Sequence, residues 1–220
     1  PEGEASTSNF RLEEVPVPSL APGQILVRNH WLSLDPYMRG RMNEGRSYAA
    51  AQALGDVMVG GTAGEVIESR NPAFAAGDLV VAYLGWQEYG VSDGAGVYKV
   101  DTRHVPLPAY LGPVGMPGVT AWYGLNRIIE PMQGQTVVVS AASGAVGSVV
   151  GQLARLGGCR AIGIAGGAEK CAYVTRELQF DACIDYKSED VDARLRELAP
   201  KGVHVFFDNT GGELQHTVIG

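Results

Sequence analysis

Residues 136–147 read TVVVSAASGAVG, a valine-rich strand pattern followed by glycines at a fixed spacing. The spacing is Ala-x-Gly-x-x-Gly, with Ala142 in place of the first glycine of the usual dinucleotide fingerprint. We expect Ala142 to allow the tight turn out of the strand, Gly144 to let the backbone approach a pyrophosphate, and Gly147 to let the next helix pack closely. The start of that helix would offer unpaired N–H groups to phosphate. The alternative is a glycine-rich turn that binds no ligand.

The chain after about residue 120 alternates strand and helix patterns. We expect strands at 136–139, 161–164, 182–184 and 203–207, and helices at 146–156, 169–178 and 191–198. This alternation is typical of βαβ units around a parallel sheet, so residues 120–220 are predicted to form a doubly wound Rossmann domain. A complete sheet of this kind has about six strands, and the patterns give only four, so we expect the domain to be incomplete in this chain.

Residues 1–119 are richer in short β-like runs separated by Gly, Pro, Asn and Asp. Strands are expected at 24–28, 64–68 and 78–83. Short strands separated by turns predict an antiparallel, barrel-like domain. The predicted fold class is therefore α/β, with a β-rich domain followed by a parallel-sheet domain.

Composition excludes several classes of function. The net charge of −7 argues against nucleic acid as a partner, because phosphate binding needs a clustered basic face. Apolar runs stay well short of the roughly 18 residues that a membrane span requires. Cys159, Cys171 and Cys183 lie 12 residues apart without a Cys-x-x-Cys pair, and the chain starts without a signal-like segment. These features indicate a reducing, cytoplasmic location, with the cysteines as small buried hydrophobes and not metal ligands.

The end of the second predicted strand indicates which cofactor the glycine loop would bind. Residues 165–170 read AGGAEK, so the strand ends in neutral Gly166 and Lys170 follows one turn later. NAD enzymes usually carry a carboxylate at such a strand end, and that carboxylate would repel a ribose 2′-phosphate. The sequence therefore predicts NADP(H), with a solvated helix lysine as the alternative for Lys170. Tyr186 and Asn209 follow the next two strands and are expected at the same crevice, or else as a surface aromatic and a turn residue.

With these motifs in place, the chain resembles the zinc-independent alkenal/one reductase branch of the medium-chain dehydrogenase/reductases. That branch includes prostaglandin reductases, plant double-bond reductases and bacterial curcumin reductases. The matching segments are LSLDPYMRGRM (32–42), VGMPGVTAWYGL (114–125), AIGIAGGAEKC (161–171) and FDNTGGE (207–213). The bacterial curcumin-reductase type is most similar, because of MVGG at 58–61 and GWQEY at 85–89. The resemblance implies a GroES-like catalytic domain before the Rossmann domain, a homodimer, and a continuation of roughly a hundred residues that completes the sheet.

Zinc-dependent members of that superfamily carry an early cysteine and a Gly-His-Glu segment, and this chain departs from both. Residues 32–39 read LSLDPYMR and residues 60–65 read GGTAGE. The first cysteine is Cys159, and the four histidines are scattered along the sequence. The sequence therefore predicts no zinc site.

The resemblance also implies cofactor contacts and a substrate-lining tyrosine. The implied contacts are Gly144, Ala145, Val146 and Gly147 for pyrophosphate, Gly166, Lys170 and Tyr186 for the 2′-phosphate end, Asn209 for the crevice, and Met116 and Thr120 near the nicotinamide. Read from the residues alone, Thr120 lies in the first turn of a helix, where N-capping is the alternative role. Tyr48 corresponds to a tyrosine that lines the substrate site, as a lining residue or proton donor, with an exposed loop tyrosine as the alternative.

Without zinc, the chemistry open to a nicotinamide is hydride transfer to a carbon that is already activated. We expect NADPH-dependent reduction of the C=C bond of α,β-unsaturated ketones and aldehydes, with hydride added at the β-carbon. The proton donor stays open between Tyr48, a ribose hydroxyl, water and a residue outside this chain. The alternatives are an NADPH:quinone oxidoreductase of the same superfamily and a non-catalytic NADPH-binding protein.

Overall fold

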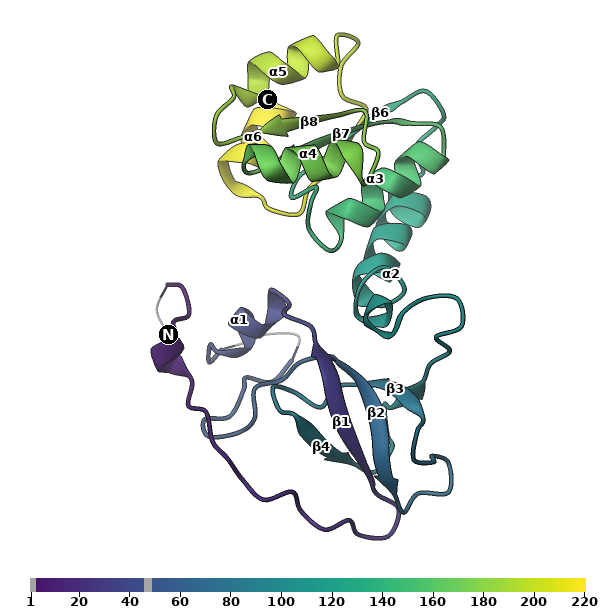
Figure 1. Cartoon of the computed structure of the whole chain (residues 1–220). Helices are drawn as coiled ribbons and strands as arrows, with labels where there is room; N and C mark the ends of the chain where they lie inside the picture. Colours follow the sequence, from purple (N-terminus) through teal and green to yellow (C-terminus); the bar gives the residue numbers. More distant parts are fainter. Residues whose placement is uncertain (1–2, 46–48) are drawn as a thin grey trace. The chain divides into compact units, whose positions relative to one another are not determined.

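A computed structural model describes residues 3–45 and 49–220 (Figure 1). The chain forms two compact units, Pro1–Leu111 and Gly112–Gly220. The change of unit therefore falls eight residues before the 119/120 boundary expected from sequence. The reason is helix α2 (Met116–Tyr123), which packs against α3 (Gly147–Leu156) and so belongs with the second unit.

The first unit is built on one antiparallel sheet in the order β4-β1-β2-β3-β5. Its elements are the short helices η1 (Thr7–Asn9), α1 (Tyr37–Arg41) and η2 (Leu107–Leu111) and the strands β1 (Ile25–Leu32), β2 (Thr62–Ser69), β3 (Leu79–Ala82), β4 (Tyr89–Ser92) and β5 (Tyr98–Lys99). Strands β1, β2 and β3 confirm the three expected from sequence. Ile25, Val27, Val66 and Val80 are fully buried on the core side, where each contributes roughly 1.5–3 kcal/mol through burial.

The second unit contains a parallel sheet in the order β8-β7-β6-β9. After α2 its elements are η3 (Gly124–Ile129, a π-helix), β6 (Thr136–Val139), α3, β7 (Arg160–Ala165), α4 (Ala168–Arg176), β8 (Ala182–Asp185), α5 (Val191–Leu198), β9 (Val205–Phe207) and α6 (Gly212–Ile219). The strands and helices expected between residues 136 and 207 are confirmed, most within one or two residues. The chain builds outward from β6 to β8 and then returns to pair β9 on the other side of β6.

The parallel sheet is covered on both faces, as the valine-rich sequence of β6 requires. Val137 and Val139 pack with residues of α3 and α4, whereas Val138 packs with the cluster that includes residues of α5 and α6. Successive side chains of a strand point to opposite faces of the sheet. Because both faces are covered, all three valines are fully buried. The carboxyl ends of β6 and β9 flank the point where the strand order reverses, which is where ligands bind in sheets of this type.

Candidate cofactor site

The loop after β6 presents backbone amides at the start of α3. Ser148 N donates to Gly144 O over 3.0 Å, so the amides of residues 145–147 precede the first intrahelical bond. Val146 occupies the N-cap position, and no side chain caps this helix. Ala145 is exposed at the turn. The loop therefore leaves the backbone N–H groups of residues 145–147 outside the hydrogen bonds of the helix, and their binding of pyrophosphate stays a prediction.

Close backbone packing in this loop explains its small residues. A Cβ on Gly147 would lie 2.4 Å from Ala141 O and 3.0 Å from Ala142 Cα, so a side chain there would push α3 off the loop. A Cβ on Gly144 would lie 3.1 Å from Ala141 O. The residue with positive φ is Ala141, at 46°, and not Ala142. Ala142 is instead buried against Gly163 of β7. A Cβ built on Gly163 would lie 2.8 Å from the Cβ of Ala142. The turn role expected of Ala142 thus falls one residue earlier.

The turn after β7 brings Gly166 and Tyr186 together. A Cβ on Gly166 would lie 2.8 Å from the Tyr186 hydroxyl and 2.9 Å from two of its ring carbons, so the tyrosine ring lies against the glycine backbone. Gly167 follows with φ of 106° and occupies the N-cap position of α4. Lys170 is exposed in the first turn of that helix. The neutral end of β7 at Gly166, the Tyr186 hydroxyl and Lys170 are therefore grouped at the carboxyl ends of the parallel strands.

A pocket of about 370 Å³ extends this group toward the glycine loop. Its lining residues are Ser143, Glu169, Lys170 and Tyr173. Ser143 belongs to the loop after β6, and the other three share one face of α4 because their spacing follows the helical repeat. Of these four residues, the sequence predicted Lys170 alone. Once a helix was expected at 169–178, the helical spacing of Glu169, Lys170 and Tyr173 was the signal that could have placed Glu169 and Tyr173 beside Lys170.

Asn209 joins the ends of β6 and β9. Its side-chain amide donates to Ser140 O over 2.9 Å, and its backbone N–H donates to Ser140 Oγ over 2.7 Å. Ser140 Oγ in turn donates to Asp208 Oδ1 over 2.9 Å. Burial alone would raise the pKa of Asp208, but hydrogen bonds from Thr210 N, Gly211 N and Ser140 outweigh it and lower the pKa below its usual value. One of the two side-chain N–H donors of Asn209 is thus used within the protein.

Met116 and Thr120 lie on α2 and contact each other. The Thr120 hydroxyl donates to Met116 O over 2.8 Å. Because α2 begins at Met116, Thr120 lies in the second turn, so the N-capping alternative is wrong and Gly115 occupies the N-cap position. Met116 is 46% exposed. Tyr48 lies outside the described residues, and its role stays a prediction.

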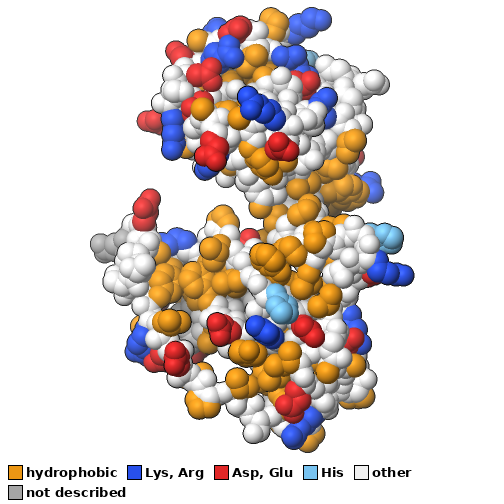
Figure 2. Space-filling view, in the orientation of Figure 1, with side chains coloured by type: hydrophobic (Ala, Val, Ile, Leu, Met, Phe, Trp, Pro, Cys, Tyr) orange, Lys and Arg blue, Asp and Glu red, His pale blue; other side chains and the backbone are white. Residues whose placement is uncertain are grey.

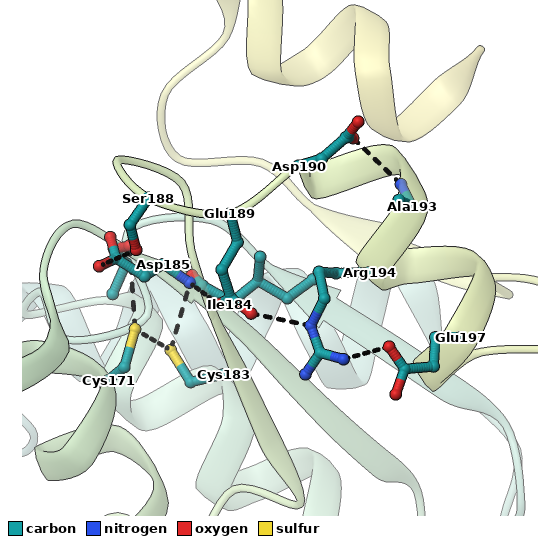
Figure 3. A network of polar contacts seen from close by, with 11 residues as sticks. Cys171, Cys183, Ile184, Asp185, Ser188, Glu189, Asp190, Ala193, Arg194 and Glu197 are labelled. Carbon is teal, nitrogen blue, oxygen red and sulfur yellow. Dashed lines mark hydrogen bonds and ion pairs between the residues drawn. The ribbon is translucent and has the colours of Figure 1, made fainter.

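Cys171 and Cys183 are neighbours, which their equal spacing in the sequence did not indicate. Their sulfur atoms lie 3.1 Å apart, one on α4 and one on β8, and both thiols are free (Figure 3). Burial raises the pKa of both thiols, more strongly for Cys183. Cys159 is buried on its own just before β7, as expected of a small hydrophobe.

Within residues 3–45 and 49–220, no group of three His, Cys, Asp or Glu side chains is placed to hold a metal ion. The helices of the described part of the chain are all too short or too polar to cross a membrane. Figure 2 shows positive and negative side chains interspersed over the visible face of the second unit, in the orientation of Figure 1.

Comparisons with known proteins agree with this architecture. The model of the "N-terminal domain of oxidoreductase" family matches residues 1–100, and the "Zinc-binding dehydrogenase" family model matches residues 145–219. The chain belongs to the medium-chain dehydrogenase/reductases, in the zinc-independent branch of the alkenal reductases.

Particular relatives lie within that branch. The NADPH-dependent curcumin reductase of Escherichia coli (strain K12) is 46% identical over all of this chain, which spans 64% of that relative's length. Prostaglandin reductase 1 of Rattus norvegicus is 45% identical to this chain. The match covers 99% of this chain and 65% of the length of that relative. The crystal structure of CurA in complex with NADPH from Vibrio vulnificus superposes with a TM-score of 0.92 at 45% identity, covering 100% of this chain and 65% of that one.

Proposed function

We propose that the protein uses NADPH to reduce the C=C bond of α,β-unsaturated ketones or aldehydes. The observation that carries the cofactor choice is the neutral end of β7, where Gly166 lies against Tyr186 and Lys170 follows in α4. The relatives support the same cofactor: the E. coli relative is named an NADPH-dependent curcumin reductase, and the V. vulnificus CurA structure is a complex with NADPH. The family resemblance supports a cytoplasmic homodimer, for which the oligomeric state in solution is the test.

The described residues fit such a dinucleotide. The open amides of residues 145–147 suit a pyrophosphate, and Gly144 and Gly147 keep the loop free of bulky side chains. Lys170 and Tyr186 would bind the 2′-phosphate as a cation and a hydroxyl donor. Asn209 would line the crevice, with one side-chain N–H held by Ser140 O and its amide oxygen and second N–H left for a ligand. Met116 and Thr120 are proposed at the nicotinamide end.

The bound cofactor supplies a hydride. The protein has to place the β-carbon of the substrate beside the donor, exclude water and deliver a proton to the α-carbon. Tyr48 is proposed to line the substrate site or to give that proton. An enone, NADPH and one proton would then yield a saturated ketone and NADP⁺.

The test is to mix full-length protein and NADPH with an enone, a quinone or a saturated ketone, and to follow near-ultraviolet absorbance. We expect NADPH consumption with the enone and a saturated ketone product by NMR. Consumption with the quinone alone would replace the substrate class and keep the cofactor. NADPH binding without consumption by any acceptor would instead favour a non-catalytic binding protein.

A further inference from the structure

Asp185, the last residue of β8, uses its side chain to hold the turn that follows the neighbouring strand. Its Oδ1 accepts hydrogen bonds from Gly167 N over 2.7 Å and Lys187 N over 3.1 Å. Its Oδ2 accepts from the Ser188 hydroxyl over 2.8 Å. The residue is 9% exposed. The carboxylate thus ties the β7–α4 turn to the β8–α5 turn across 18 residues of sequence.

Other contacts hold the two sides of the β7–α4 turn: Tyr186 lies against Gly166, Tyr186 N donates to Ala165 O over 3.2 Å, and Cys171 N donates to Gly167 O over 3.1 Å. Gly167 has φ of 106°, and a Cβ built on it would meet no atom within 4 Å, so side-chain packing does not hold it in place. The N-terminus of α4 also lacks a side-chain cap. The hydrogen bond from Gly167 N to Asp185 therefore helps to orient the Gly166–Gly167 peptide that leads into α4, and Lys170 follows three residues later.

The segment that carries Asp185 is itself braced. Asp185 N donates to Glu189 Oε2 over 2.8 Å, and Glu189 Oε1 pairs with Arg194 Nε over 2.8 Å. Arg194 also pairs with Glu197 on α5 (Figure 3). In Figure 3 these side chains form one line from Ser188 to Glu197. These contacts therefore connect the β8–α5 turn to residues within α5.

Asp185 is not arranged as a ribose ligand of the kind that NAD enzymes use. Such a carboxylate offers free oxygens to two ribose hydroxyls. Here Oδ1 accepts two protein hydrogen bonds and Oδ2 accepts one. Its charge is thereby directed into backbone amides, which limits its repulsion of a phosphate at the neighbouring turn.

We propose that Asp185 is a positioning residue that fixes the Gly166–Gly167 turn, and through it Lys170, for recognition of the ribose 2′-phosphate. This inference rests on the proposed NADPH dependence and deepens it. Because both carboxylate oxygens accept hydrogen bonds from the protein, Asp185 would act through the turn, and its effect is expected on discrimination between NADPH and NADH and not on the rate of hydride transfer.

The test compares Asp185→Ala with Asp185→Asn in full-length protein, by measuring the Kd of NADPH and NADH and the kcat at saturating NADPH. Asp185→Ala should weaken NADPH binding about tenfold, the scale of a lost hydrogen bond to a charged group, and change NADH binding much less. Its kcat should stay close to wild type. Asp185→Asn should restore selectivity, because the Asn oxygen can accept from Gly167 N while its amide donates to Ser188 Oγ.

Asp190→Ala is the matched control, since Asp190 also accepts a backbone N–H but caps α5 instead. It should leave the selectivity unchanged. In a Lys170→Ala background, Asp185→Ala should have little further effect on NADPH binding, because the two residues act on the same phosphate. Should Asp185→Ala fail to fold, Asp185→Ser, whose shorter side chain ends before the carboxylate position, is measured in its place.

Two outcomes would overturn the inference alone: unchanged selectivity in Asp185→Ala, or a loss in Asp185→Asn as large as in Asp185→Ala. Both presuppose a wild-type protein that prefers NADPH. A wild-type protein without that preference would instead overturn the proposed cofactor, and this inference with it.

Discussion

Helices α4 and α5 are consecutive in the chain and follow neighbouring strands, yet their N-termini are built differently. The N-cap of α4 is Gly167, with no side chain on the helix amides. The N-cap of α5 is Asp190, whose carboxylate accepts from Ala193 N over 3.1 Å. A capped helix start is complete by itself, whereas an uncapped one leaves donors and a positive dipole end for a ligand. Helix α3 likewise lacks a side-chain cap, and the proposed phosphate sites lie at the starts of α3 and α4. Helices α2 and α6 lack one too, so the missing cap permits a ligand there and does not by itself mark a site.

The largest effect is expected from closing the space at the start of α3. Gly147→Ala places a Cβ 2.4 Å from Ala141 O, so we expect a loss of about 1–3 kcal/mol in the free energy of unfolding. NADPH affinity should fall more than about tenfold as the loop shifts. Urea unfolding and NADPH titration measure both effects. Gly157→Ala at the other end of α3, where the nearest atom is 3.4 Å away, is the control and should change neither quantity by much.

Removing the positive charge of Lys170 at the start of α4 should weaken cofactor binding and leave the fold unchanged. Lys170→Ala should weaken NADPH binding by about 10- to 100-fold, the range of a charge-assisted hydrogen bond, and leave NADH binding nearly unchanged. The measurement is a pair of Kd values at two salt concentrations, where the variant should show the weaker salt dependence. Lys201→Ala, at an exposed lysine after α5, should behave as wild type; equal losses for both cofactors in Lys170→Ala would count against a 2′-phosphate contact.

The opposite result is expected at the capped helix. Asp190→Ala should lower the free energy of unfolding by about 1 kcal/mol, the usual cost of a lost N-cap. Its NADPH affinity should equal that of wild type once both proteins are folded. Urea unfolding and a cofactor titration on the same preparation check this, and a fall in affinity would mean that the start of α5 also contributes to the site.

The smallest expected effect concerns pH and the link between β6 and β9. Hydrogen bonds lower the pKa of Asp208 in the folded state despite its partial burial. Its contribution to stability is therefore complete above the unfolded-state pKa of about 3.9 and is lost as pH falls through the lower folded-state value. Asp208→Asn should remove this part of the acid dependence. Urea midpoints at pH 7, 5 and 3 would show it as a flatter profile for the variant, and parallel profiles would contradict it.

The sequence predicted the second unit well because its strands and helices carry strong local patterns. The strand at 136–139 and the helix at 191–198 match β6 and α5 residue for residue. The short strands β4 and β5 went unpredicted, since two to four half-exposed residues leave little pattern to read. Likewise η3 and α6 were not among the elements predicted from sequence.

The candidate site was predicted only where a motif names its residues. Gly144 and Gly147 follow from a fingerprint, and Gly166 and Lys170 follow from their distance to it. The role of Asp185 depends on a hydrogen bond between residues 18 positions apart, and the contact of Cys171 with Cys183 depends on how α4 packs on β8. Both are tertiary facts, and spacing alone does not encode them.

The return of the chain to β6 also has a consequence for how the second unit folds. Val137 pairs with Ala161, 24 residues on, and with Val205, 68 residues on. Closing the longer loop costs about 0.9 kcal/mol more in chain entropy. We therefore expect β9 to join last, with the hydrogen bonds of Ser140 to Asp208 and Asn209 forming after the barrier. Substitutions at these bonds should then speed unfolding and leave the folding rate almost unchanged, so this cluster governs how long the unit stays folded.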